Sequence, residues 1–340
     1  METQPAPPRR AVARNLQISN RFSSQPRLTL FETGTYTHLM SERRFFRAAL
    51  LVTALVAVAS ARPGAQTNQR SMYVSVLDAS GAPVPDLGPS DFMVRDDNVA
   101  REVLTVTSAG EPMQIEVLVD NSAAADDYIA DLRRALPPFM AELVKPNGAG
   151  TRNEVGLVTL GERPAIATRS TFDAAELKKG AERLHAQSDS GNYLLDGIVE
   201  VTKGFKTRGA TRPVIVVITT EGPEFSSQHF DAVLTPLRET GAALHVLVVG
   251  PNVNDTTDEG KNRSVVLDRG PKSSGGRFEH LLSSMALGPK LTQLANELNH
   301  QYRVTFGRPA SLIPPETTTV SATKAGLTAR GTVIKEQGKP

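Results

Sequence analysis

Residues 114–306 alternate between short apolar runs and longer segments in which apolar side chains recur at helical spacing. The expected strands are 114–120, 154–160, 165–171, 213–219, 244–249 and 302–306. The expected helices are 124–144, 174–186, 193–205, 230–240 and 289–300. Strands that alternate with helices of these lengths form parallel sheets through right-handed crossovers. The pattern therefore predicts an α/β fold with a doubly wound, Rossmann-like, mostly parallel sheet and one antiparallel hairpin around Gly161–Pro164.

The α/β domain is expected to span residues 112–308, and two of its segments depart from the simple pattern. Pro137 lies within the expected helix 124–144 and predicts a kink or a split, because proline lacks the amide hydrogen that a helix interior uses. Residues 250–287 are rich in Gly, Ser, Asn and Asp. An insert of that length is expected to be a functional or a mobile loop.

Short β-type segments flank this domain on both sides. The expected strands within residues 70–110 are 73–77, 92–98 and 102–107. Residues 309–340 begin with a proline-rich linker, and their expected strands are 317–323 and 327–333. Because three strands need further strands or a covering layer to be stable, the N-terminal β-rich module is expected to pair with the C-terminal strands.

Residues 40–66 have the three parts of an export signal. An arginine-rich start (residues 43–47) precedes an apolar stretch over 48–59, and Ala59–Ala61 resembles a cleavage site. The apolar stretch is shorter than the about 20 residues that span a bilayer. The pattern predicts a cleaved signal peptide, no stable membrane span after cleavage, and a secreted, periplasmic or cell-envelope location. A buried helix or a short anchor is the alternative, and the paired arginines fit the twin-arginine route as well as the general secretory route.

Residues 1–39 show neither helical nor strand periodicity, and they are expected to be a disordered tail or the product of a misplaced start, with translation beginning at Met40. Residues 1–66 carry nine Arg and three Glu, so the formal charge of +2 for the chain becomes −4 over residues 67–340. A nucleic-acid partner is therefore not expected. The absence of cysteine from the sequence excludes disulfides, cysteine-based zinc sites and cysteine nucleophiles.

The expected strand 114–120 delivers polar side chains to the carboxyl edge of the predicted sheet. Asp120 and Ser122 follow an apolar run directly and precede a helix. In open α/β sheets the crevice at this edge binds ligands. These two side chains are therefore candidate ligand-binding groups.

Several segments resemble the von Willebrand factor A-related proteins that are abundant in Acidobacteria-type genomes. The segments that carry the resemblance are Val74–Leu87, Asp91–Asp97, Val117–Ser122, Ile215–Gly222, Tyr302–Phe306 and Val320–Arg330. The third resembles the metal-site strand of that family, and the fourth resembles an apolar strand that ends in Thr-Asp-Gly. The resemblance covers residues 71–335 and implies a von Willebrand factor A-like fold with a non-catalytic role in adhesion or protein binding.

In that family a divalent cation binds an acidic side chain of the partner. Three loops hold the cation: the first provides Asp, Ser and Ser, the second a Thr, and the third often an Asp. The resemblance places Asp120 and Ser122 in the first loop, Asn192 in the second and Glu221 in the third. Ala124 stands where the family has its second serine, so the resemblance implies a degenerate metal-ion-dependent adhesion site. Hard oxygen ligands suit Mg²⁺ or Mn²⁺, and no other cofactor is expected.

The neighbourhood of these residues offers further candidates and alternatives. The residues expected to contact the partner are Asn121, Ser190 and Thr220. The second-loop ligand could instead be Ser188 or Ser190. Each metal-site residue also has a structural alternative, because the first-loop and second-loop side chains can cap the helices that follow them, and Glu221 can be a solvated strand end.

No familiar catalytic motif occurs in the sequence, which lacks Gly-x-Ser-x-Gly, His-Glu-x-x-His and the Gly-rich phosphate-binding patterns. His245 lies in the apolar run 244–249 and is expected to be a hydrogen-bonded core residue. The leading interpretation is a non-catalytic module that binds a protein partner through an acidic side chain of that partner. The alternatives are a scaffolding protein of the envelope without a working metal site and, more remotely, a hydrolase that uses the same crevice.

Overall fold

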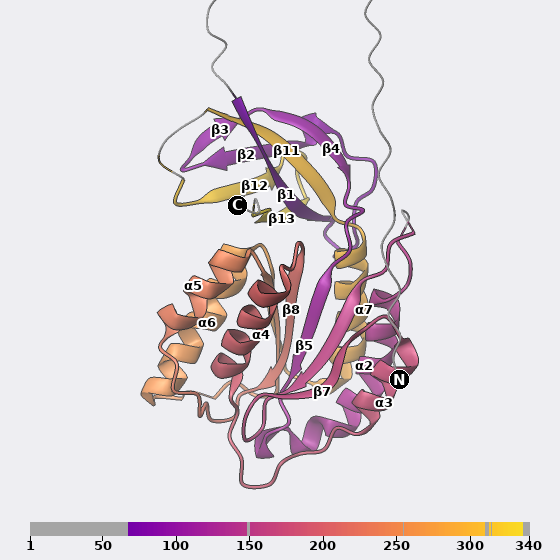
Figure 1. Cartoon of the computed structure of the whole chain (residues 1–340), viewed down its shortest axis with the longest axis vertical. Coiled ribbons are helices and arrows are strands. Elements are labelled where there is room, and N and C mark those ends of the chain that lie inside the picture. Colours follow the sequence, from indigo (N-terminus) through magenta and orange to yellow (C-terminus); the bar gives the residue numbers. More distant parts are fainter. Residues whose placement is uncertain (1–66, 148–149, 254, 310–312, 314, 336–340) are drawn as a thin grey trace, which may run out of the picture. The chain divides into compact units, whose positions relative to one another are not determined.

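The computed structural model, which describes residues 67–147, 150–253, 255–309, 313 and 315–335, contains a six-stranded sheet with the order β10-β9-β8-β5-β6-β7 (Figure 1). Its strands are β5 (Gln114–Val119), β6 (Glu154–Thr159), β7 (Ala165–Thr171), β8 (Pro213–Thr220), β9 (Ala243–Val249) and β10 (Phe278–Leu281). Every pairing is parallel except that of β6 with β7, which is antiparallel. The predicted doubly wound, mostly parallel sheet with one hairpin is confirmed.

Three helices cover each face of this sheet. One face carries α2 (Ile129–Leu143), α3 (Ala174–Glu182) and α7 (Leu287–Asn299). The other carries α4 (Leu194–Arg208), α5 (Phe230–Thr240) and α6 (Asp258–Ser274). Every residue of β8 is buried, because helices cover both of its faces, and its sequence is therefore apolar up to the two threonines at its end.

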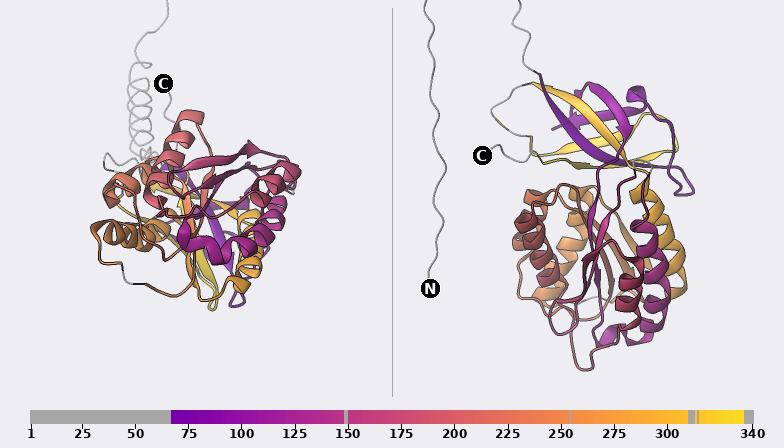
Figure 2. Two further views of the ribbon diagram at one scale, coloured as in Figure 1. Left: turned by 90° about the horizontal axis from the view of Figure 1, so that it is seen from below. Right: turned by 45° about the vertical axis from the view of Figure 1, so that its right-hand side comes forward.

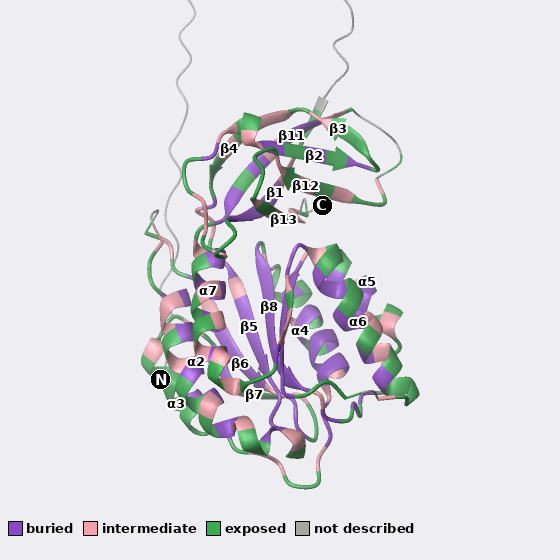
Figure 3. Ribbon diagram, turned by 180° about the vertical axis from the view of Figure 1, so that it is seen from behind, coloured by how far each residue is buried: buried purple, intermediate pink, exposed green. Residues whose placement is uncertain are grey.

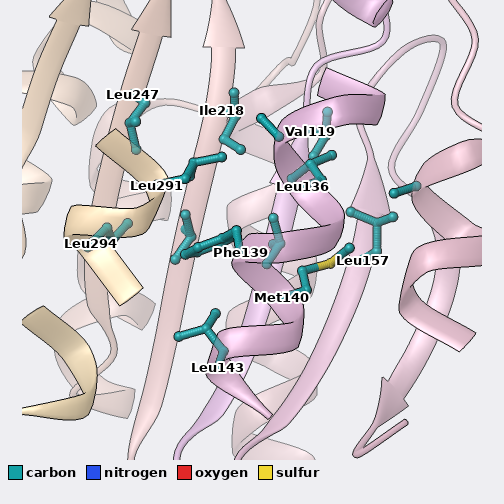
Figure 4. Close-up of a cluster of buried hydrophobic side chains, with 14 of the residues drawn as sticks. Val119, Leu136, Phe139, Met140, Leu143, Leu157, Ile218, Leu247, Leu291 and Leu294 are labelled. Carbon is teal, nitrogen blue, oxygen red and sulfur yellow. The ribbon is translucent and has the colours of Figure 1, made fainter. Parts of the chain in front are cut away.

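The core on the first face joins helices to strands that are distant in sequence. Phe139 of α2 and Leu291 of α7 lie in one cluster with Val119 of β5 and Ile218 of β8 (Figure 4). Burial of each such side chain contributes about 1.5–3 kcal/mol relative to exposure. This packing holds the carboxyl ends of β5 and β8 side by side.

The remaining strands form two antiparallel sheets that share a separate core. The first has the order β13-β1-β11-β4 and contains β1 (Thr67–Leu77), β4 (Val103–Ser108), β11 (Tyr302–Pro309) and β13 (Thr328–Val333). The second has the order β12-β2-β3 and contains β2 (Phe92–Asp96), β3 (Val99–Arg101) and β12 (Thr318–Ala322), preceded by a short helix η1 (Pro89–Asp91). Met72, Val94 and Phe306 are among the buried residues of this core. Figure 2 shows the strands of the two sheets lying against one another, and Figure 3 shows buried stretches along them.

The pairing of N-terminal with C-terminal strands is confirmed, because β13 pairs with β1 and β12 pairs with β2. The six-stranded sheet and its helices are therefore inserted, in sequence, between β4 and β11 of this β-sandwich. The expectation for residues 302–306 differs from the structure: these residues belong to β11, which pairs with β1 and β4 rather than with the α/β sheet. An apolar run predicts a buried strand but not the sheet in which that strand pairs.

Two further expectations need correction. Residues 250–287 are not a long loop, because they contain α6, β10 and a short helix η3 (Ser284–Ala286). The sequence of α6 is polar, and few of its side chains are buried and apolar, which hides its helical period. Residues 123–128 form a short 3-10 helix η2, and α2 then continues through Pro137 and Pro138 without being split.

The predicted tail and signal peptide, residues 1–66, lie outside the described residues. Within the part of the chain that the structure describes, no helix has the length and apolar character needed to cross a bilayer.

Candidate functional site

Asp120 follows β5 and joins two strand ends through its carboxylate. The side chain is buried, with 1% exposure. Its Oδ1 accepts a hydrogen bond from the Ser122 amide at 2.9 Å. Its Oδ2 accepts from the Thr220 amide at 3.0 Å and from the Thr220 hydroxyl at 2.6 Å. The carboxylate therefore fastens the loop after β5 to the end of β8.

Asn192 brings a third segment, the loop before α4, to the same carboxylate. Its Nδ2 donates to Asp120 Oδ2 at 3.1 Å and to the Thr219 hydroxyl at 2.6 Å. This orientation of the amide follows from the chemistry, since the reverse orientation would place two oxygens against each other. Asn192 Oδ1 then points elsewhere, and it is buried without a hydrogen-bond partner among the described residues.

Ser122 holds a second buried oxygen of the same kind. Its side chain is fully buried, and its Oγ finds no hydrogen-bond partner in the described part of the chain. Ser122 is the N-cap residue of η2, yet its side chain makes no capping bond, and α4 is preceded by Tyr193 rather than by Asn192 as N-cap residue. The capping alternatives for Ser122 and Asn192 are therefore wrong. A buried oxygen without a partner costs about 1–3 kcal/mol, so a water or an ion bound to these atoms would be stabilising.

Gly222 packs so closely against Ala124 that a larger side chain would not fit there without a shift. A Cβ placed on Gly222 would lie 3.3 Å from Thr220 Oγ1 and 3.8 Å from Ser122 Oγ. It would also lie 2.5 Å from the Cβ of Ala124, which is where the resemblance has a second serine. Neutral oxygens beside one carboxylate form a donor set that fits a hard divalent cation such as Mg²⁺ or Mn²⁺. With one carboxylate in the set, the fit is to a weak site.

Glu221, the third-loop candidate, pairs with Arg263 and lies close to His280. Its Oε2 lies 3.2 Å from Arg263 Nη1, and its Oε1 lies 3.8 Å from His280 Nε2. The side chain is 17% exposed, so it is not a freely solvated strand end. Within the described residues, no group of three or more His, Cys, Asp or Glu side chains could hold a metal.

The three expected partner-contacting residues are not equally available. Asn121 is buried and bonds across the loops, accepting from the Gly161 amide at 2.7 Å and donating to the His185 carbonyl at 3.1 Å. Thr220 is buried and bonded to Asp120. Ser190 is half-buried, and its hydroxyl donates to the Gln187 carbonyl at 2.8 Å.

Sequence reasoning missed two charged residues at this site, Glu224 and Arg263. Glu224 Oε1 accepts from the Ser226 amide at 3.3 Å and from the Leu195 amide at 3.4 Å. Burial raises the pKa of the Glu224 carboxyl to about 7. Arg263 lies in α6, which the composition of residues 250–287 did not reveal as a helix. No pattern in the sequence marked either residue.

His245 of β9 is fully buried, but the expectation of a hydrogen-bonded core residue is wrong. Neither of its ring nitrogens has a hydrogen-bond partner among the described residues. Burial lowers the pKa of His245 to about 4, so the ring is neutral near pH 7.

No known protein-family model matches the chain, and no curated protein does. Solved structures that resemble it include a von Willebrand factor type A protein from Catenulispora acidiphila, with 10% identity over 79% of this chain and 73% of that chain and a TM-score of 0.43. The vWF domain of the type V pili tip protein Mfa5 from Porphyromonas gingivalis has 10% identity over 56% of this chain and 96% of that chain, with a TM-score of 0.43.

A third similar structure is proximal thread matrix protein 1 from the mussel byssus with a zinc occupied MIDAS motif, with 13% identity over 60% of this chain and a TM-score of 0.43. The present chain spans 49% of that mussel protein. Von Willebrand factor A domain proteins are thus among the structural neighbours. At these identities and TM-scores, the likenesses carry no argument about function.

Proposed function

We propose that the protein is a secreted or envelope-associated, von Willebrand factor A-like module that binds a protein partner without catalysis, and that a weakly held divalent cation completes its binding site. The observation that carries this proposal is a pair of buried oxygens, Ser122 Oγ and Asn192 Oδ1, that have no hydrogen-bond partner in the described part of the chain. Both belong to residues that bond the Asp120 carboxylate. A hard cation would coordinate such oxygens, whereas their burial among apolar side chains alone would cost free energy.

The cation would be Mg²⁺ or Mn²⁺, held by Ser122 and Asn192 with the charge of Asp120 behind them. When bound, it supplies a positive point that attracts an acidic side chain of the partner. The chain itself supplies the arrangement, because Asp120 fastens the loop after β5 to Asn192 and Thr220. Asn121 and Ser190 stabilise neighbouring loops, because Asn121 accepts a hydrogen bond from the Gly161 amide and Ser190 donates one to the Gln187 carbonyl.

Exposed apolar side chains at the same edge of the sheet provide a surface for the rest of the partner. Phe225 follows β8, Val253 follows β9, and Leu282 and Met285 follow β10. Phe225 and Val253 are both 52% exposed, and Leu282 and Met285 are 83% and 84% exposed. Apolar side chains gathered around a polar site are typical of protein-binding surfaces. The partner is therefore expected to combine an acidic side chain with apolar neighbours.

Thermal unfolding of the full chain tests the cation, first in EDTA and then with Mg²⁺, Mn²⁺ or Ca²⁺. A ligand at about 100 times its dissociation constant stabilises the native state by about 2.7 kcal/mol. Ser122→Ala should abolish the stabilisation by the ion but cost little without it, because its hydroxyl has no hydrogen-bond partner among the described residues. Ser71→Ala, which removes a hydroxyl bonded to Thr305 in the β-sandwich, is the matched control and should keep the ion effect. Equal melting in EDTA and in all three ions would refute the cation.

The partner surface has its own test once a purified partner is in hand. Leu282→Glu combined with Met285→Glu should abolish binding, because two charges replace exposed apolar contacts. Met93→Glu, at an exposed position of β2, should leave binding unchanged. Unchanged binding by the double variant would move the interface away from this edge.

A scaffolding role without a working metal site is the second candidate. Ala124 removes one expected ligand, and Arg263 engages Glu221, so a cation loses two oxygens that the resemblance would provide. In that case the Asp120 network is a purely structural tie between loops. Absence of any ion effect, together with a stability loss in Asp120→Ala, would favour this role.

A further inference from the structure

Arg263 is a buried cation fixed against the candidate cation site. Its side chain is 5% exposed. The guanidinium lies 3.2 Å from Glu221 Oε2 through Nη1 and 3.8 Å from Glu224 Oε2 through Nε. Its Nη2 donates to the Thr220 carbonyl, and the Thr220 hydroxyl donates to Asp120. One residue separates the guanidinium from the carboxylate at the centre of the site.

The position of Arg263 is set by a helix and not by a mobile loop. The side chain of Thr257 caps α6 by accepting from the Gly260 amide at 3.0 Å. Asn262, the residue before Arg263, accepts from the Phe230 amide at 3.1 Å through its Oδ1. Val266, one turn later, is fully buried in the core. Arg263 is therefore held in place before any ion arrives.

We propose that Arg263 is a built-in cation that withholds Glu221 from the divalent ion and so sets the low affinity of the site. This inference rests on the cation site proposed above. Of the carboxylates close to Thr220, Glu221 is paired with Arg263, which leaves Asp120 as the charge available to an ion. The positive charge of Arg263, which is linked to Asp120 through Thr220, also repels a divalent ion directly. Both effects act in the same direction, so removal of the guanidinium should tighten ion binding.

The test is calorimetric titration of the full chain with Mn²⁺, comparing the native protein with Arg263→Gln. The dissociation constant of the variant should be at least about tenfold lower, because the variant frees Glu221 and removes a positive charge beside the site. A merely structural role for Arg263 would weaken or abolish ion binding, since it would only loosen the loops. An increase in affinity therefore separates the two roles.

Two further variants keep the result interpretable. Arg263→Gln leaves Glu224 buried without its cation, so Arg263→Gln combined with Glu224→Gln removes both charges while the amide oxygen can still accept from Leu195 and Ser226. Arg277→Gln is the matched control, because Arg277 is also largely enclosed, with 9% side-chain exposure, but pairs with Glu297 and precedes β10 at its other end. It changes the net charge by the same amount and should leave the Mn²⁺ affinity unchanged.

The outcomes separate this inference from the function on which it rests. Tighter binding in Arg263→Gln or in the double variant supports it, including the case in which the native protein shows no binding. Measurable binding by the native protein with equal or weaker binding in both folded variants overturns the role of Arg263 and leaves the cation site standing. Absence of binding in all of them overturns both proposals.

Discussion

The Thr220 hydroxyl donates to Asp120 Oδ2 at 2.6 Å although the two residues are 100 positions apart in the chain. The Thr220 amide adds a second bond to the same oxygen at 3.0 Å. Because β5 and β8 are neighbours and parallel, the residues that follow them meet at one edge of the sheet. This contact makes Asp120 the centre of the candidate site, whether or not an ion binds.

Asp120→Ala should lower the free energy of unfolding by about 3 kcal/mol, measured by urea denaturation in EDTA. The substitution leaves the buried donors of Thr220 and Asn192 without their acceptor, and each such loss is worth about 1–3 kcal/mol. Asp173→Ala is the control, because Asp173 caps α3 on the surface and its loss should cost only about 1 kcal/mol. Equal costs for the two variants would show that Asp120 does not tie the loops together.

Ala124→Ser should strengthen Mn²⁺ binding by roughly three- to tenfold, since one added oxygen ligand contributes about 1 kcal/mol. Ala124 packs against Gly222, which lies close to Thr220 and Ser122, so a hydroxyl added at residue 124 is close to the candidate site. Calorimetric titration measures the change. Ala123→Ser adds the same hydroxyl at an exposed neighbouring position and should have no effect. If the native protein binds Mn²⁺ and neither variant binds it more tightly, the ion does not bind beside Ala124.

The buried ring of His245 predicts a loss of stability in acid. Its pKa is about 4 in the folded protein and 6.5 as the ordinary value, so the unfolded chain takes up the proton first as the pH falls. The stability that depends on the neutral ring is present above pH 6.5 and is lost between pH 6.5 and about 4, by on the order of 3 kcal/mol.

His245→Leu should remove this part of the pH dependence and unfold at higher urea concentration than the native protein at pH 5. Neither ring nitrogen has a partner among the described residues, so an apolar side chain loses no hydrogen bond. His229→Leu, at a side chain with 62% exposure, is the control and should leave the acid profile as it is. Identical profiles for the native protein and His245→Leu would contradict the prediction.

Glu224 predicts the opposite pH dependence. Its pKa is raised by burial to about 7 from the ordinary value of 4.5, so the folded protein keeps a proton that the unfolded chain has lost. The corresponding stability is present below pH 4.5 and is lost as the pH rises to about 7. Glu224→Gln should therefore be more stable than the native protein at pH 8, by on the order of 3 kcal/mol, and similar to it at pH 4.

Urea denaturation at the two pH values measures this difference. Glu239→Gln, at a side chain with 56% exposure on α5, is the control and should show no such pH effect. A Glu224→Gln variant that is less stable at both pH values would mean that the ion pair with Arg263 outweighs the cost of burial.

The limits of sequence-based prediction are visible in particular elements. The apolar run of β8 and the helical period of α4 were readable, because burial of a strand or of one helix face leaves a local repeat. The helix α6 was not readable, since few of its buried residues are apolar and its cap and ion pairs, such as Arg263 with Glu221, leave no repeat in the sequence. Such ion pairs join distant residues.

The sequence by itself determined the doubly wound sheet and the location of Asp120 at a strand end, because these follow from periodicities a few residues long. The pairing of the flanking strands was predictable for another reason, since three strands need further strands to be stable. Only the tertiary structure decided that β11 joins the β-sandwich, that Asn192 and Thr220 meet Asp120, and that Arg263 holds Glu221. Those outcomes depend on which distant segments pack together, and local patterns of apolar residues do not specify the partner of a charged or amide side chain.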